Sequence, residues 1–245
     1  IKSGRSAART GIISWERAPD MTIQIARVEE RFKSPGPQPN GLHAAADGLW
    51  YIDQVDLKVY KLDYQTGEIL FEAQTDTEHS SGITFGNGSL WVSSTFELKI
   101  AELDPATGQT VSKRDSPGNG IVAWAADQEN GRITGAHGLE WKDGRIYVAA
   151  PPSQLIHVVD VATWREIRSF RAPGLRVHGL AWAEDGTLWV ADTSAGTVSR
   201  LDEDGRVWEV IRVPAPVEVH GLTIYEGVLW YCDAASCGIG QLFLD

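Results

Sequence analysis

Cysteine and methionine are scarce in this chain, which has two cysteines and one methionine among 245 residues. Cys232 and Cys237 cannot make a disulfide framework, and their spacing is not the C-x-x-C of a redox or zinc pair. A chain of this length with 42% hydrophobic residues can bury a sizeable core without such links. We therefore expect an ordinary globular core.

Basic clusters and long apolar runs are also missing. The formal net charge is -11, which disfavours binding to nucleic-acid backbones or anionic membranes. No stretch approaches the roughly 18 apolar residues of a transmembrane helix. The first residues carry Lys2, Arg5 and Arg9 but no apolar segment of the signal-peptide kind. We expect a cytoplasmic protein that binds neither nucleic acid nor membrane; the composition leaves its oligomeric state open.

Familiar catalytic motifs are absent as well. The sequence has no G-x-S-x-G elbow, no H-E-x-x-H and no phosphate-binding loop. GNGSLW is a hairpin turn, because it separates two strand patterns and opens no helix.

Tryptophan and glycine are plentiful, and both follow an internal repeat. Five segments align at intervals of about 40–45 residues, with one longer interval. They begin at Asn40, Ser81, His137, His178 and His220. Each unit reads as a strand, a tight turn such as Asp-Gly, a second strand with an aromatic residue, and further short strands.

Four short strands in each unit of this length are typical of a propeller blade. We predict an all-β fold, a single five-bladed β-propeller of four-stranded antiparallel blades. The last repeat stops after its third strand, so residues 22–32 are expected to supply the fourth and close the ring. We assign residues 1–20 to an N-terminal arm and 21–245 to the propeller. The insertion at about 115–135, which contains Trp124, is a candidate lid or partner-contact loop, or else an irregular surface loop.

The first strand of each propeller blade lines the central channel, so the residue before its glycine should form a ring. That ring is Asn40, Ser81, His137, His178 and His220. Because side chains alternate along a strand, residues two positions earlier should face the same way. That second ring is Gln38, His79, Gly135, Arg176 and Glu218. A third set follows the second-strand aromatic: Asp53, Ser94, Ala150, Asp192 and Asp233.

Buried imidazoles and charges are costly unless they are paired or hold a ligand or metal. Histidine with carboxylate suits zinc, manganese or iron, and carboxylates alone suit magnesium or calcium. The other interpretation is that the polar ring holds water and caps turns. His43 and His157 fall outside the rings and are expected to be structural.

The pattern HGL-x(6–8)-G-x-LW-x-x-D resembles virginiamycin B lyase and related propellers. That resemblance implies a magnesium-assisted elimination, with the family's functional positions filled here by His178, Glu218, His220 and Asp233. His220 would be the general base, Asp233 and Glu218 would hold the metal, and His178 would protonate the leaving oxygen or orient the substrate. Arg176 would meet an anionic group. The family has seven blades and typically Glu where this chain has Asp233, so substrate specificity does not transfer.

Two other resemblances are weaker. Asn40 with Asp233 partly matches the metal set of the gluconolactonase and regucalcin-like family. The LDPATG segment, Leu103 to Gly108, is similar in style to five-bladed glutaminyl cyclases. His137, His178 and His220 could also form a three-histidine metal site.

The sequence thus favours a metal-dependent enzyme of small molecules, a lyase acting on ester- or lactone-like substrates. The alternatives are a lactonase-type hydrolase, a non-catalytic ligand binder and a scaffold. Candidate catalytic residues are His220, His178 and Glu218. Candidate metal ligands are Asp233, His137, Glu218 and His178. Candidate substrate-binding residues are Arg176, Asn40, His79 and Asp192.

Overall fold

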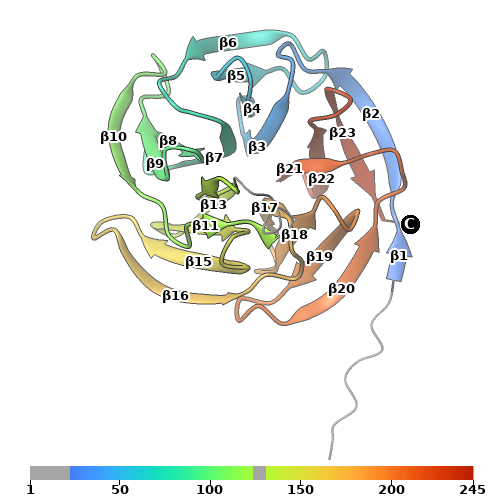
Figure 1. Ribbon diagram of the computed structural model, residues 1–245. Helices are drawn as coiled ribbons and strands as arrows, with labels where there is room; N and C mark the ends of the chain where they lie inside the picture. Colours follow the sequence, from blue (N-terminus) through green and yellow to red (C-terminus); the bar gives the residue numbers. More distant parts are fainter. Residues whose placement is uncertain (1–22, 124–130, 245) are drawn as a thin grey trace, which may run out of the picture.

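The computed structural model describes residues 23–123 and 131–244, which form five sheets around one axis (Figure 1). The predicted five-bladed propeller is therefore confirmed. The N-terminal arm and Trp124 lie outside the described residues. In the described residues there is no helix long and apolar enough to cross a membrane.

The blades follow one another in chain order, each running from the axis outwards (Figure 1). Blade 1 contains β3 (Pro39–Ala45), β4 (Gly48–Asp53), β5 (Lys58–Leu62) and β6 (Ile69–Gln74). Blade 2 contains β7 (Ser80–Gly86), β8 (Ser89–Ser94), β9 (Lys99–Leu103) and β10 (Thr110–Asp115). Blade 3 contains β13 (Gly138–Lys142), β14 (Arg145–Ala150), β15 (Leu155–Asp160) and β16 (Arg165–Arg171). Blade 4 contains β17 (Val177–Trp182), β18 (Leu188–Asp192), β19 (Thr197–Leu201) and β20 (Val207–Arg212).

Blade 5 is completed by the start of the chain, as the repeat predicts. Its inner strands are β21 (Val219–Tyr225), β22 (Val228–Asp233) and β23 (Gly238–Phe243), and β2 (Arg27–Lys33) pairs antiparallel with β23. Just before β2, the short β1 (Ile23–Ile25) pairs parallel with β20 of blade 4. The N-terminal segment thus joins blades 4 and 5 along their outer edges, with Ala26 buried between the two strands.

The insertion before blade 3 carries a small ladder of its own. β11 (Gly120–Ile121) pairs antiparallel with β12 (Ile133–Thr134). Its first residues cross blade 3, since Gly118 lies against Ser153 and His157.

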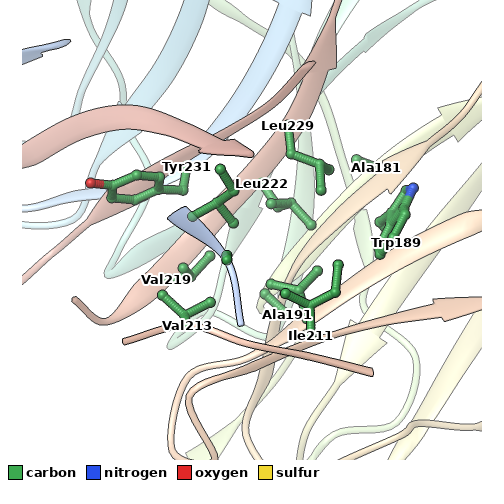
Figure 2. Close-up of a cluster of buried hydrophobic side chains, with 12 residues drawn as sticks. Ala181, Trp189, Ala191, Ile211, Val213, Val219, Leu222, Leu229 and Tyr231 are labelled. Carbon is green, nitrogen blue, oxygen red and sulfur yellow. The ribbon is translucent and has the colours of Figure 1, made fainter. Parts of the chain in front are cut away.

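The core lies between neighbouring blades. Figure 2 shows the cluster between blades 4 and 5, where Trp189 and Ile211 of one blade meet Leu222 and Leu229 of the next. The repeated second-strand aromatic is buried in every blade. These rings fill the wedge between sheets, where large side chains gain most from leaving water.

The inner strands pack so closely that the central channel is closed at their level. A Cβ on Gly138 would lie 1.6 Å from the His178 carbonyl oxygen, and one on Gly82 would lie 2.3 Å from that of His137. The repeated glycine therefore lets each inner strand touch the next backbone. The remaining central cavity is about 10 Å³, room for at most one water molecule.

Four of the five inner strands carry a bulge at the same step. In blade 1 Pro39 pairs with Asp53 while Gly41 pairs with Ile52, so one residue is extra; blades 2, 4 and 5 show similar shifts. A bulge breaks the alternation of side chains. The bulge therefore makes strand pairing irregular at the step where the ring residues lie.

Candidate functional site

Three histidines meet on the axis, at the starts of the inner strands of blades 3, 4 and 5. The ring centroids of His137 and His178 are 4.6 Å apart, and those of His178 and His220 are 5.1 Å apart. All three residues are buried. With the neighbouring Arg176, we call these residues the axial cluster.

Hydrogen bonds assign the proton on each ring. His178 Nδ1 lies 3.2 Å from the carbonyl oxygen of Arg176, and a carbonyl can only accept, so Nδ1 carries the proton. Its Nε2 therefore accepts from His137 Nδ1, at 2.9 Å. His220 Nδ1 lies 3.1 Å from the carbonyl oxygen of Glu218 and is likewise protonated.

Two nitrogen lone pairs remain after these assignments. Nε2 of His137 is buried and has no hydrogen-bond partner in the described part of the chain. Nε2 of His220 is the other, since only Nδ1 of that ring is engaged by the residues described. Both nitrogens of His178 are engaged, so this residue positions its neighbours.

The environment keeps these rings neutral. Burial lowers the pKa of His137 to about 3, with help from nearby positive charge. Burial and the neighbouring histidines hold the pKa of His178 well below its usual range. Burial also lowers the pKa of His220, although the bond to the Glu218 carbonyl and the charges of Glu218 and Asp233 oppose the shift. Near neutral pH the two lone pairs are available as acceptors or bases.

Arg176 and Glu218 bring charge to the same place. Arg176 is half-buried, and its positive charge contributes to the lowered pKa of all three axial histidines. Glu218 is exposed, so its carboxylate is at the solvent side of His220. The cluster thus combines a neutral base with a fixed cation.

On the blade 1 and blade 2 side of the axis lie Asn40 and His79, two of the predicted substrate-binding residues. Asn40 is buried, and its Oδ1 has no hydrogen-bond partner among the described residues. His79 does not lie in β7; it has a left-handed backbone with φ 53°, and its ring stacks on Phe96 at 3.8 Å. Burial, with the charge of Arg132, lowers the pKa of His79 to about 4.

Asp233, a predicted metal ligand, and Asp192, a predicted substrate-binding residue, both accept hydrogen bonds from backbone amides. Asp233 accepts from the amides of Ala235 and Ser236 through Oδ1, and from Ser236 Oγ and the Glu218 amide through Oδ2. Asp192 accepts from the amides of Leu175, Arg176 and Ala195. Both carboxylates tie the turn after the second strand to the loop before the first.

The predicted metal set therefore does not fit the structure. Asp233 has both oxygens engaged, and His137 and His178 are bonded to each other. Among residues 23–123 and 131–244, no group of three or more His, Cys, Asp or Glu side chains is arranged to hold a metal ion. Asp192, which the sequence assigned to substrate binding, accepts hydrogen bonds from backbone amides through both oxygens.

Sequence reasoning missed a second polar set, three residues after the ring position. His43 Nδ1 lies 3.3 Å from Thr84 Oγ1 and 3.7 Å from Glu140 Oε2. Glu140 is buried, and Oε2 has no hydrogen-bond partner within the described ranges. The repeat itself held the signal, because His43, Thr84 and Glu140 occupy one column of the alignment.

A surface groove lies away from these groups. It has a volume of about 480 Å³ between blades 4 and 5 and is lined by residues such as Trp189, Arg200 and Phe243. Its lining contains no histidine. Volume alone therefore does not identify the functional site.

The fold is shared with known enzymes. Glutaminyl cyclase from Myxococcus xanthus matches with a TM-score of 0.74 at 10% identity, over 92% of this chain and 99% of that one. This match and the two that follow establish similarity of fold alone. A streptogramin B lyase gives 0.55 at 18% identity, over 90% and 98% of the two chains. Virginiamycin B lyase from Staphylococcus aureus gives 0.56 at 15% identity, over 90% and 100%. No protein-family model matches the sequence, and no curated protein is similar to it.

Proposed function

We propose that the axial cluster is the active site of an enzyme that removes a proton from a small, anionic, ester- or lactone-like substrate. His220 is the general base, and the favoured outcome is elimination of the C–O bond. The observation that carries this proposal is the Nε2 lone pair of His220, a ring whose Nδ1 is held by the Glu218 carbonyl and whose pKa is lowered by burial and by the charge of Arg176. The propeller lyases with the same kind of blade support it at the level of fold.

The proposed chemistry assigns one task to each group. Arg176 binds the substrate's anionic group and stabilises negative charge as it develops on the carbonyl oxygen. His220 Nε2 takes the proton α to that carbonyl, and protonated His220 then returns a proton to the leaving oxygen or to water. The Glu218 carbonyl holds His220 in the required tautomer. His178 is a positioning residue, because both of its nitrogens are engaged.

The proposed steps use only side chains of this chain. Asp233, one of the two carboxylates that the sequence assigned to a metal, accepts hydrogen bonds from the backbone. Removing Asp233 is therefore expected to disturb the loop that carries Glu218 and His220, whatever the reaction.

The test uses a panel of carboxylated esters and lactones with the wild type, His220→Gln and a matched control, His43→Gln, which lies outside the axial cluster. Elimination gives a conjugated alkene, which is followed by ultraviolet absorbance. We expect His220→Gln to lose about 100-fold or more of kcat/KM, the usual contribution of a general base, while His43→Gln retains activity. Equal activity in all three proteins contradicts the assignment of His220.

The pH profile offers a second check on the base. A base must be unprotonated to act, and burial lowers the pKa of His220 below 6.5. We therefore expect kcat/KM to stay level as the pH falls past 6.5 and to decline only at lower pH.

A lactonase reaction is the alternative at the same site, with His220 activating water. Oxygen-labelled water separates the two reactions, because hydrolysis incorporates solvent oxygen into the acid and elimination does not. A non-catalytic binder is the other alternative, favoured by the buried acceptor on Asn40. It predicts calorimetric binding of small anions that depends on Arg176, with no product formed.

A further inference from the structure

Blade 3 carries a serine, a histidine and a glutamate in hydrogen-bonded sequence, apart from the axial cluster. Ser153 lies in the turn between β14 and β15, His157 on β15 and Glu166 on β16. Ser153 Oγ is 2.9 Å from His157 Nε2, and His157 Nδ1 is 3.0 Å from Glu166 Oε2. This is the order of a nucleophile, a base and a group that orients the base.

The equivalent turns of the other blades do not make this arrangement. In blade 1 the same two positions hold Asp56 and Tyr60, whose hydroxyl bonds the carboxylate at 2.5 Å. In blade 4 they hold Ala195 and Ser199, and in blade 5 Ser236 and Gly240. The imidazole of blade 3 is therefore not a requirement of the blade.

Blade 3 also lacks the carboxylate that, in blades 1 and 4, holds the loop before the inner strand by hydrogen bonds. Asp53 in blade 1 and Asp192 in blade 4 accept from loop amides, but the equivalent residue in blade 3 is Ala150. The loops of blades 1, 3 and 4 share a Pro-Gly step, with Gly36, Gly118 and Gly174. In blades 1 and 4 a Cβ on the glycine would run into the carboxylate.

In blade 3 the same loop glycine lies over the serine and the histidine. A Cβ on Gly118 would be 2.5 Å from His157 Nε2 and 2.6 Å from Ser153 Oγ, and its φ of 68° favours glycine. The loop that delivers amides to a carboxylate in blades 1 and 4 therefore passes beside a hydroxyl. Backbone amides next to a serine nucleophile are what an acyl transition state requires.

We propose that Ser153, His157 and Glu166 form a second, nucleophilic site that accepts the acyl group of small esters, independent of the axial site. Ser153 Oγ bonds to the ester carbonyl carbon while its proton passes to His157 Nε2. The bond to the alkoxy group breaks, and that oxygen leaves as alcohol with the proton from His157. Water then attacks the acyl-serine by the same route, releasing the acid and restoring the serine proton. Glu166 holds the Nδ1 proton and so orients the imidazole.

The surroundings of the serine are crowded. His157 is buried, Ser153 is half-buried, and Gly118 lies against one side of the pair. The proposal is therefore confined to acyl groups of a few carbons. Glu166 is exposed, so its contribution should be smaller than that of a buried acid.

The test is covalent labelling by a small alkyl fluorophosphonate, read by mass spectrometry of the intact protein and its peptides. Ser153 Oγ displaces fluoride from phosphorus, and the proton leaves through His157. We expect one adduct per chain, on Ser153, formed at least about 100-fold more slowly in His157→Gln. In His157→Gln the rate of nitrophenyl acetate hydrolysis should fall together with the labelling rate. In Glu166→Gln both rates should fall by a smaller factor.

His220→Gln is the matched control, because it removes the proposed axial base and should leave labelling of Ser153 unchanged. Ser153→Ala should lose the adduct while it keeps the wild-type circular dichroism spectrum. A folded wild type that is not labelled at Ser153, or a labelling rate unaffected by His157→Gln, overturns the proposal. Either result leaves the axial proposal standing, since the axial assays do not use Ser153.

Discussion

Blades 3 and 4 are neighbours with the same four strands, yet they fix the loop before the inner strand by different means. Blade 4 uses Asp192, whose carboxylate accepts three backbone amides. Blade 3 has Ala150 there, and its loop glycine rests on Ser153 and His157. In blade 4 the carboxylate anchors the loop, whereas in blade 3 a serine and a histidine lie where that anchor is missing.

The loop-anchoring role of these carboxylates explains why the predicted metal ligands do not fit the structure. Asp53, Asp192 and Asp233 recur at one repeat position, and Asp233 was predicted to hold a metal. Recurrence in three blades reflects a shared loop anchor instead, because each carboxylate binds the amides of its own blade. The asymmetric residues are the better guide to chemistry: the histidines of blades 3 to 5 and the serine–histidine pair of blade 3.

The largest effect is expected where the two blades touch. In Gly138→Ala the new methyl would lie 1.6 Å from the His178 carbonyl oxygen, so the inner strands must separate. We expect a loss of at least about 3 kcal/mol in the free energy of unfolding, the upper part of the range for overpacking. Urea denaturation measures it. Gly120→Ala is the control, with only Pro152 at 3.3 Å; similar losses in both variants contradict the tight axial contact.

Asp192→Ala should be the next most damaging change. It leaves three backbone amides without their carboxylate acceptor and loosens the loop that carries Arg176. Hydrogen bonds to charged groups are each worth about 1.5–3 kcal/mol, and water will replace part of the loss. We expect about 3 kcal/mol in denaturant unfolding, with a smaller loss for Asp192→Asn. A loss below about 1 kcal/mol would show that the Asp192 carboxylate is not a strong loop anchor, and the difference between blades 4 and 3 would then disappear.

Much of the fold could be predicted because the repeat fixed blade number and strand order. The N-terminal closure also followed, since the last repeat lacks a strand. The closed axis did not follow, although the glycine of every His-Gly or Ser-Gly step was visible; only the packing of five strands shows how close they come. The bulge at that step likewise depends on pairing between strands, which the repeat pattern does not reveal.

For the site, the meeting of His137, His178 and His220 could be predicted from their shared column. Their roles could not, because tautomers depend on carbonyl groups such as that of Arg176, which sequence does not place. His157 was interpreted as structural because it stands outside the rings. Its neighbours Ser153 and Glu166 come from a turn and another strand, and their approach depends on the register between β15 and β16.

Acid should weaken the junction of blades 3 and 4 in a defined pH range. His137 has a pKa of about 3 in the folded chain and about 6.5 when unfolded. The unfolded chain therefore binds more protons between these values, and stability falls as the pH falls from 6.5. Each such histidine contributes a slope of up to about 1.4 kcal/mol per pH unit. In His137→Gln the free energy of unfolding should depend less steeply on pH, by the equivalent of about one bound proton. An unchanged slope contradicts the buried, neutral state of His137.

The smallest effect on stability should come from Ser153→Ala, the blade 3 counterpart of Asp192→Ala. Ser153 Oγ has one proton, which it shares between two acceptors, His157 Nε2 at 2.9 Å and the carbonyl oxygen of Ala150 at 3.0 Å. Such bonds contribute about 1 kcal/mol net, and the half-buried site lets water replace them. We expect about 1 kcal/mol or less in urea unfolding, against about 3 kcal/mol for Asp192→Ala. A loss as large as that of Asp192→Ala would mean that blade 3 uses its serine and histidine as the same kind of anchor, and the fluorophosphonate adduct should then be absent. A small loss together with a specific adduct is the combination that only a reactive serine gives.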